Sequence, residues 1–294
     1  MAGPTAVGKT AIAIQVANHF NVPIVSADSR QFYREMSIGT AKPNEKELSQ
    51  AEHYFIGSHS IVSPISAGEY ERIALKKIEE LHQEHKVIIL TGGSGLFIDA
   101  VCKGLDDLPK VAPKIRAELQ IEFEENGLLY LQEKLKKLDP EYFLICDQLN
   151  PHRLIRAIEL CQTSGKKMAE LRNQKTAVRP FDIIYIALNS ERKELYKRIN
   201  QRVHHMLKLG LESEARSLFP KKDLVALNTV GYSELFSYFS GKINISEAVE
   251  LIKRNSRRYA KRQITWFKRN PEYNWLHPNE IDKIISLSEK KMDE

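Results

Sequence analysis

Features that are scarce in this sequence narrow what the protein can be. The chain has three cysteines, Cys102, Cys146 and Cys161, and they show neither C-x-x-C spacing nor a histidine at ligand spacing. This usage is typical of a reducing compartment, and we expect a cytoplasmic protein. The longest apolar runs, such as VIIL at 87–90, fall far short of the ~20 residues that a membrane-spanning helix requires. We therefore expect no membrane span and no signal peptide.

Low-complexity tracts and internal repeats are also lacking, which disfavours a disordered or repeat protein. The 294 residues, of which 42% are hydrophobic and 28% charged, suit one large globular domain or a domain with an insertion.

Acidic residues are missing from one stretch, residues 251–269, although the net charge of the chain is only +6. This stretch holds eight basic residues: Lys253, Arg254, Arg257, Arg258, Lys261, Arg262, Lys268 and Arg269. A local excess of this kind favours a polyanionic partner, and its other reading is a solvated helix face.

A glycine-rich loop at residues 3–10, GPTAVGKT, has the G-x-x-x-x-G-K-T spacing of a phosphate-binding loop. Glycines let backbone amides point inward, the following helix adds positive potential, Lys9 reaches a terminal phosphate and Thr10 can bind Mg²⁺. Such a loop normally follows a buried strand, yet only Met1 and Ala2 precede it here. Either a strand precedes this sequence, or the sheet lacks its central strand and the loop is loosened.

The order of elements predicts an α/β fold with a parallel sheet flanked by helices, as in P-loop NTPases. A helix opens at Lys9, and a short β-rich run ends at Asp28. An amphipathic helix over 68–83 leads into a buried strand and a second glycine-rich turn, KVIILTGGSG. The charged helical segments of 113–176 predict an inserted, mostly helical domain between core segments 1–112 and 177–294.

The last part of the chain predicts two further helices after the strand FDIIYIALN. One is long and closed by Gly210, and a final one begins near Ser246, which can cap it. In the final helix, Arg254, Arg258 and Arg262 repeat every four residues on an outward side. The opposite, core-facing side holds Val249, Ile252, Tyr259, Gln263 and Trp266.

Asp28 and a pair of arginines are the candidate reactive groups. Asp28 follows a strand, at the sheet edge where α/β proteins bind ligands, so it is a candidate general base; its other reading is a helix N-cap or turn aspartate. Arg198 and Arg202 lie four apart on one helix and could face a diphosphate, or they could be a surface pair. The run VIIL ends without an acid, which disfavours ATP hydrolysis. His82, His85, His204 and His205 are not expected to bind a metal.

Six motifs, in this order, resemble the tRNA dimethylallyltransferase family, also called tRNA isopentenyltransferases. They are GPTAVGKT, SADSRQFYREMSIGTAKP, LTGGSGLF, NPHRLIRAIEL, NTVGYSEL and YAKRQITWFKR, and they run from residue 3 to about residue 270. Two motif positions depart mildly from the family pattern, with Ser94 for threonine and Phe97 for tyrosine.

The resemblance implies transfer of a dimethylallyl group from dimethylallyl diphosphate to N6 of the adenosine 3′ of the tRNA anticodon. In that reading Asp28 accepts the N6 proton, Arg202 braces the phosphates, Thr10 contributes to Mg²⁺ and Ser94 takes the place of the family threonine. The diphosphate is bound by Gly3, Pro4, Thr5, Ala6, Val7, Gly8, Lys9 and Thr10.

The partner implied is the tRNA anticodon stem-loop, with its adenosine flipped from the stack. We expect the enzyme to be a monomer. The implied tRNA contacts are Asp28, Ser29, Arg30, Gln31, Ser94, Arg116, His152, Arg153, Leu154, Ile155, Arg156, Thr229, Val230, Gly231, Tyr232, Ser233 and Glu234. The basic side of the last helix, Arg254, Arg258 and Arg262, would bind tRNA phosphates.

Two alternatives stay open at this point. One is a P-loop kinase for a small molecule or a nucleoside, which shares the loop and the core. The other is a non-catalytic RNA-binding relative that has lost activity together with its first strand. The basic stretch and the DSRQFY motif disfavour the kinase.

Overall fold

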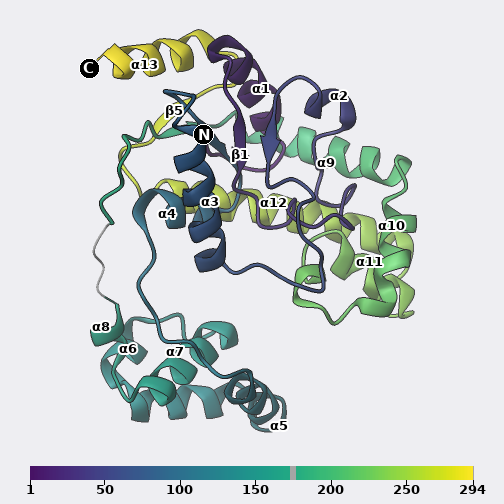
Figure 1. The fold of residues 1–294 in the computed structure, drawn as a ribbon. Helices are drawn as coiled ribbons and strands as arrows, with labels where there is room; N and C mark the ends of the chain where they lie inside the picture. Colours follow the sequence, from purple (N-terminus) through teal and green to yellow (C-terminus); the bar gives the residue numbers. More distant parts are fainter. Residues whose placement is uncertain (173–176, 294) are drawn as a thin grey trace. The chain divides into compact units, whose positions relative to one another are not determined.

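The computed structural model describes residues 1–172 and 177–293 of the chain. It divides into two compact units. The first combines Met1–Lys103 with Arg179–Glu294, and the second is Gly104–Val178. Figure 1 shows the first unit as a sheet flanked by helices and the second as helices alone.

The second unit starts earlier than the predicted inserted domain, 113–176. The side chains of Leu108 and Val111 pack against its hydrophobic core, which draws this connecting segment into the unit. The predicted end at residue 176 lies outside the described residues.

Short parallel strands form the sheet of the first unit. They are β1 (Ile24–Ser26), β2 (His53–Tyr54), β3 (Ile89–Thr91), β4 (Ile186–Leu188) and β5 (Asn274–Leu276). β1 lies between β2 and β3 and pairs with both in parallel, while β4 pairs in parallel with β5. The predicted α/β class with a parallel sheet is confirmed.

Met1 and Ala2 occupy the place between β3 and β4. The amino group of Met1 donates to Leu90 O at 2.6 Å, and Ala2 N donates to Ile186 O at 2.7 Å. Leu188 N in turn donates to Ala2 O at 2.9 Å. These two residues therefore join the strand groups into one layer and anchor the loop that follows. They fill the central position for which the sequence left open either an upstream strand or a gap.

Each face of the sheet has its own hydrophobic core, because alternate strand residues point to opposite faces. Ile24, Ile186 and Leu188 belong to one core, while Val25 and Ala187 belong to the other. Both faces of the strands are thus buried, as in other parallel sheets.

The helices of the first unit pack around this sheet (Figure 1). They are α1 (Lys9–Phe20), α2 (Glu45–Leu48), α3 (Ala67–Leu81), α4 (Gly95–Lys103), α9 (Arg192–Lys208), α10 (Leu211–Leu218), α11 (Tyr232–Phe239), α12 (Ile245–Phe267) and α13 (Ile281–Asp293), with 3-10 turns at Phe219–Lys221 and Val225–Leu227. Gly210 follows α9 with a φ of 100°, the left-handed conformation expected of the residue that closes a helix.

The end of the chain differs from prediction in two ways. α12 is capped by Asn244 and not by Ser246, because the Asn244 side chain accepts a hydrogen bond from Glu247 N at 2.9 Å. In addition, α12 is not the last helix, since α13 follows it and packs on α1 through Ile284.

The second unit is built from α5 (Pro113–Leu138), α6 (Pro140–Ile145), α7 (Pro151–Ser164) and α8 (Met168–Leu171). α5 bends at Gly127, whose φ of 74° is not helical. α7 begins at Pro151 and ends before Gly165, as the sequence predicts. Within the described residues of both units, no helix is both long enough and apolar enough to span a bilayer.

Candidate active site

The loop at residues 3–8 leaves the centre of the sheet and turns sharply into α1. Gly3 and Gly8 have φ values of 144° and 110°, and Ala6 also has a positive φ. A side chain at Gly3 would place its Cβ 2.6 Å from Leu188 O. Glycine is therefore required at this position both for conformation and for space.

The start of α1 is suited to an anion. Gly8 supplies no side-chain cap, so the amides of the first turn keep their donors for a ligand. Lys9 Nζ donates to Gly3 O and Pro4 O, each at 2.9 Å, and thus lies inside the loop. Burial lowers the pKa of Lys9 to about 8, while Asp28 opposes and Arg202 reinforces the shift.

Two arginines of α9 extend this positive site. Arg202 donates to Thr5 Oγ1 at 3.1 Å, and burial lowers the pKa of its guanidinium below the usual value. A Cβ on Gly8 would lie 3.1 Å from the guanidinium of Arg198, so this side chain lies against the loop. Both arginines therefore lie against the loop, and Arg198 also lies 3.8 Å from Glu194.

Gln263 of α12 ties the loop to the second glycine-rich turn. Its Oε1 accepts from Thr5 N at 2.8 Å, and its Nε2 donates to Gly93 O at 2.8 Å. A buried amide satisfied on both sides fixes the spacing of the two turns, because either broken bond would leave a buried group unpaired.

Asp28 forms a turn and also lines a cavity. Oδ1 accepts from Arg30 N at 3.0 Å and from Gln31 N at 3.4 Å, which makes Asp28 the first residue of a turn. The same side chain lines the cavity described below, so the turn holds the carboxylate in place there.

Ser94 and Tyr259 lie next to this turn. Ser94 Oγ accepts from Ser29 N at 2.9 Å and donates to Ser29 Oγ at 3.0 Å. Burial and the Asp28 carboxylate raise the pKa of Tyr259 to about 12, and its hydroxyl also hydrogen-bonds to Ser94. Tyr259 is therefore a neutral hydrogen-bonding group beside Asp28 at physiological pH.

A cavity of about 1000 Å³ brings these groups together inside the first unit. The predicted residues that line it are Thr5, Ala6, Gly8, Lys9, Thr10, Asp28, Ser29, Arg30, Gln31, Arg202, Thr229, Val230, Gly231, Ser233, Glu234, Arg258 and Arg262. Gly3, Pro4 and Val7 are the buried residues of the loop, and their backbone shapes it. Ser94 lies one hydrogen bond away, on Ser29.

Four predicted tRNA contacts need correction. Leu154 and Ile155 lie in the hydrophobic core of the second unit, so their side chains cannot reach RNA. Tyr232 is fully buried and donates to Glu214 Oε1 at 2.6 Å. Glu234 lines the cavity, but it is almost fully buried and its two oxygens are bonded to Gly231 N and to Asn255 Nδ2, so its carboxylate already has partners inside the protein. These residues shape the structure.

Arg30 also has internal partners. Its guanidinium donates to Ala226 O at 3.0 Å, Asn228 O at 3.3 Å and Val225 O at 3.4 Å. Arg30 thus links the Asp28 turn to the segment before α11 and is not a free cation for tRNA.

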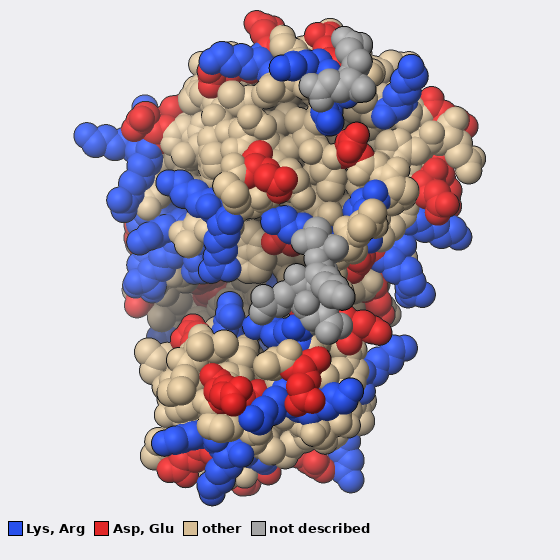
Figure 2. Space-filling view, turned by 90° about the vertical axis from the view of Figure 1, so that its left-hand side faces the viewer, with Lys and Arg blue, Asp and Glu red and all other residues tan. Residues whose placement is uncertain are grey.

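The remaining predicted cations divide between the units. In the second unit, His152 and Arg153 are exposed, whereas Arg116 and Arg156 both bind the buried Glu159 at 2.7 and 2.6 Å. In the first unit, Arg254 is exposed on α12 outside the cavity lining. On the face shown in Figure 2, basic side chains gather along one side of the first unit.

The motifs give no site role to three further residues that line the cavity, Tyr259, Gln263 and Thr91. Tyr259 and Gln263 were placed on the core-facing side of their helix, and this side meets both core and cavity. One signal in the sequence could have identified Tyr259 and Gln263. Arg262 and Gln263 follow Tyr259 by three and four residues, so the three polar side chains lie on one face of the helix. For Thr91 the only signal is its position at the end of β3.

The chain matches the IPP transferase family over residues 31–270. The chain belongs to this family. It is 52% identical to a tRNA dimethylallyltransferase of Christiangramia forsetii over 96% of this chain and 94% of that one. It is 46% identical to tRNA dimethylallyltransferase 2 of Parabacteroides distasonis, over 97% and 95% of the two chains.

Solved structures of IPP transferase relatives have the same fold. The tRNA isopentenylpyrophosphate transferase of Bacillus halodurans superposes with a TM-score of 0.74 at 32% identity, covering 99% of this chain and 95% of that one. A eukaryotic dimethylallyltransferase acting on tRNA superposes with a TM-score of 0.82, covering 99% and 78% of the two chains. At 23% identity, the second likeness bears on the fold alone.

Proposed function

We propose that the cavity of the first unit is the place where a dimethylallyl group passes from its diphosphate to a tRNA adenosine. The reaction itself is that of the family, and the prediction of a tRNA dimethylallyltransferase is confirmed by relatives that are 45–52% identical over nearly the whole chain. The kinase alternative has no support among these relatives. The observation that carries the residue-level proposal is the presence of Lys9, Arg202 and Asp28 in one cavity.

The cationic end of the cavity suits the diphosphate. The amides at the start of α1, Lys9, Arg202 and Arg198 place positive charge around the loop. As the bond between C1 of the prenyl group and the diphosphate oxygen breaks, negative charge grows on the leaving group. Donors held in place stabilise that charge without having to reorganise.

Asp28 is suited to take the proton from the attacking amine. When N6 bonds to C1, one N6 proton must leave, and a carboxylate held in the cavity can accept it. Oδ1 is already engaged by the turn amides, so we assign the proton to Oδ2. Tyr259 and Ser94 provide polar groups next to this carboxylate.

The residues also fit a magnesium ion that arrives with the diphosphate. Thr10 lines the cavity at the first turn of α1, and Thr91 lines it at the end of β3, where its buried Oγ1 has no hydrogen-bond partner. Hydroxyl and phosphate oxygens are ligands that Mg²⁺ accepts, and the ion would neutralise charge on the leaving group. The described residues contain no cluster of three His, Cys, Asp or Glu side chains for a metal, so phosphate oxygens must complete the site.

The tRNA side of the proposal rests on the polar rim of the cavity. Ser29, Gln31, Thr229, Arg258 and Arg262 line it beside Asp28. An adenosine of the anticodon loop would have to be flipped to reach this depth. We further propose that the second unit is the inserted domain and that its exposed His152 and Arg153 contact the tRNA. A cytoplasmic location and a monomeric state stay predictions.

Asp28→Asn is the experiment that tests this proposal. The asparagine Oδ1 can still accept from Arg30 N and Gln31 N, so the turn should persist while the proton acceptor is lost. We expect transfer of the dimethylallyl group to tRNA to fall by about 100-fold or more, with tRNA affinity nearly unchanged. The measurement is mass spectrometry of anticodon-loop nucleosides after incubation with tRNA, Mg²⁺ and donor.

The control is Asp282→Asn, an exposed residue in the first turn of α13, which should leave turnover unchanged. Turnover of Asp28→Asn within a few-fold of the parent would rule out the general-base role. Binding of tRNA by the parent protein without any product would instead support the non-catalytic alternative.

A further inference from the structure

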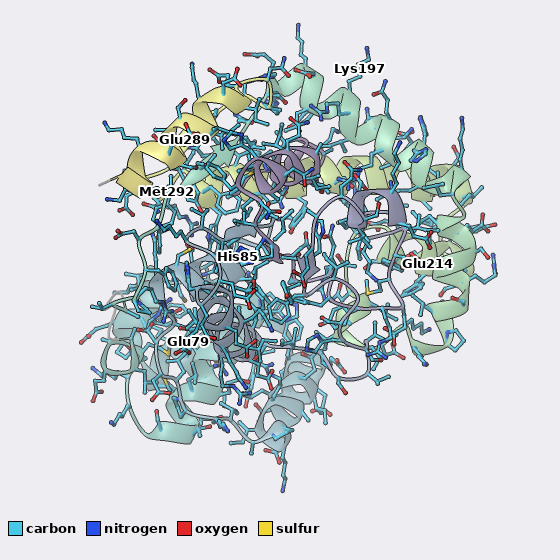
Figure 3. All side chains as sticks on the ribbon, turned by 45° about the horizontal axis from the view of Figure 1, so that its top comes forward. Glu79, His85, Lys197, Glu214, Glu289 and Met292 are labelled. Carbon is cyan, nitrogen blue, oxygen red and sulfur yellow. The ribbon has the colours of Figure 1, made fainter. Side chains whose placement is uncertain are left out.

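One carboxylate of α10 holds a loop that borders the cavity. Glu214 Oε2 accepts from Ser37 N and Ile38 N, each at 2.8 Å, and Oε1 accepts from Gly39 N at 2.9 Å. Tyr232 of α11 adds a fourth bond, from its hydroxyl to Oε1 at 2.6 Å. Figure 3 labels Glu214 on α10. Bonds to an ionised acceptor are the strong ones, so this loop is firmly fixed.

Thr40 and Ala41, which follow this loop segment, bind two side chains of the site through their carbonyl groups. Gln31 Nε2 donates to Thr40 O at 3.2 Å and to Ala41 O at 3.0 Å. Arg202 donates to the same Ala41 O at 3.5 Å. Ala41 has a φ of 49°, a conformation that a non-glycine residue keeps only when its surroundings impose it. Thr40 and Ala41 line the cavity, whereas Glu214 does not.

Close packing reinforces the bonds. A Cβ on Gly39 would lie 2.5 Å from the ring of Tyr232, so the loop backbone lies directly on this buried side chain. Residues 37–41 therefore have little freedom to shift while Glu214 and Tyr232 keep their places. The Gln31 nitrogen is bound to the two carbonyls, which turns its Oε1 away from them.

We propose that Glu214 is a positioning residue: by clamping residues 37–39 it sets the carbonyls of Thr40 and Ala41 that orient Gln31 and Arg202. The inference rests on the proposed function, in which Arg202 braces the diphosphate. Glu214 touches no substrate itself. Loss of the Glu214 carboxylate should loosen Arg202 and weaken the binding of a diphosphate. Its effect on the stability of the sheet should be smaller.

The first test is Glu214→Gln, in which the amide keeps one acceptor but turns its NH₂ toward backbone donors. We expect the Kd of inorganic diphosphate with Mg²⁺, measured by calorimetry, to rise about tenfold. Glu212→Gln is the matched control, because Glu212 lies on the same helix in an exposed pair with Arg216 at 3.2 Å. It should change the Kd by less than twofold. A folded Glu214→Gln protein with the parent Kd would overturn the inference.

A double variant separates positioning from a general structural role. If Glu214 acts through Arg202, adding Glu214→Gln to Arg202→Gln should change the Kd of diphosphate by less than twofold. Losses that multiply in the double variant would show that Glu214 acts independently of Arg202 and would overturn the inference.

Gly39→Ala is a second variant that leaves the carboxylate intact, in case Glu214→Gln does not fold. Its methyl group must displace the loop from Tyr232, so it should reproduce the weakened diphosphate binding; the parent Kd in a folded protein would contradict the inference. Diphosphate binding needs no turnover, which keeps the two proposals apart. A parent protein that binds no diphosphate would contradict the proposed function and this inference with it, whereas equal binding by parent and Glu214→Gln would contradict the inference alone.

Discussion

Lys9 shows how a single residue of the loop depends on its surroundings. Its ammonium group lies among loop carbonyls, with Asp28 and Arg202 nearby. Burial lowers its pKa to about 8, so the charged fraction falls as the pH rises from 7 to 9. A bound diphosphate favours the charged form, and binding above pH 8 must therefore include uptake of a proton.

We expect the affinity of the parent protein for inorganic diphosphate to fall several-fold between pH 7 and pH 9, relative to Lys9→Arg. The guanidinium of that variant keeps its charge over the whole range, so the comparison cancels the titration of diphosphate itself. Calorimetric titrations at a series of pH values provide the measurement. Parallel pH profiles for the two proteins would contradict the assigned pKa shift.

At the scale of the element, different faces of α12 pack in the cores, contact the loop and line the rim of the cavity. Ile252, Ala260 and Phe267 are buried in the cores, while Gln263 reaches the loop. Arg258 and Arg262 line the cavity although both are exposed. The helix period separates these faces, so a change at a rim arginine can alter binding without disturbing the core.

Arg258→Glu is therefore expected to weaken tRNA binding by about tenfold and to reduce the slope of log affinity against log salt by about one. The matched control is Lys86→Glu, the same charge change at an exposed residue just before β3, at the sheet edge opposite the loop. Filter-binding titrations at several salt concentrations measure both quantities. An unchanged salt slope for Arg258→Glu would argue against a phosphate contact.

At the scale of the whole molecule, the chain holds separate hydrophobic cores in its two units. The core of the second unit lies between α5 and α7, and ion pairs between the buried Glu159 and two surface arginines adjoin it. Glu159 is fully buried and binds Arg116 through both oxygens, at 2.8 and 2.7 Å, and Arg156 at 2.6 Å. Neither arginine is buried, so the buried Glu159 holds both guanidinium groups in place at the surface.

Glu159→Gln should destabilise the second unit by about 2 kcal/mol, because the amide NH₂ would face guanidinium donors and lose the ionised acceptor. Hydrogen exchange should show faster exchange in α5 and α7 and unchanged protection of the strands of the first unit. Glu118→Gln, in an exposed pair with Lys114 at 3.8 Å, is the control and should change neither. Equal loss of protection in both units would mean that they unfold together.

Much of the fold could be predicted from the sequence, because the patterns that indicate its elements depend on neighbouring residues. The spacing of GPTAVGKT identifies the phosphate loop, Gly210 closes α9 and Gly165 closes α7, and each needs only neighbours along the chain. Local signals predict the capping residue of a helix less well, because two suitable residues can lie close together in the sequence. Asn244 and Ser246 are both good caps in sequence, and the backbone entering α12 selects Asn244.

The sequence indicated part of the cavity lining. Asp28, Lys9 and Arg202 lie where the motifs indicated, in one cavity. The motifs could not show that Arg30 donates to carbonyls near residue 226 or that Leu154 and Ile155 face a core. A motif marks that a residue type is needed, but burial and partners distant in sequence decide whether it meets a ligand or supports its neighbours.

By itself, the sequence determined the α/β class, the phosphate loop and the family, because these depend on periodicity and on the spacing of nearby residues. Tertiary structure alone decided that Met1 and Ala2 fill the centre of the sheet, that Gln263 joins two turns and that Glu214 holds residues 37–39. These contacts link residues that are roughly 90 to 260 positions apart, and only the folded packing of the sheet and helices brings such groups within hydrogen-bonding distance.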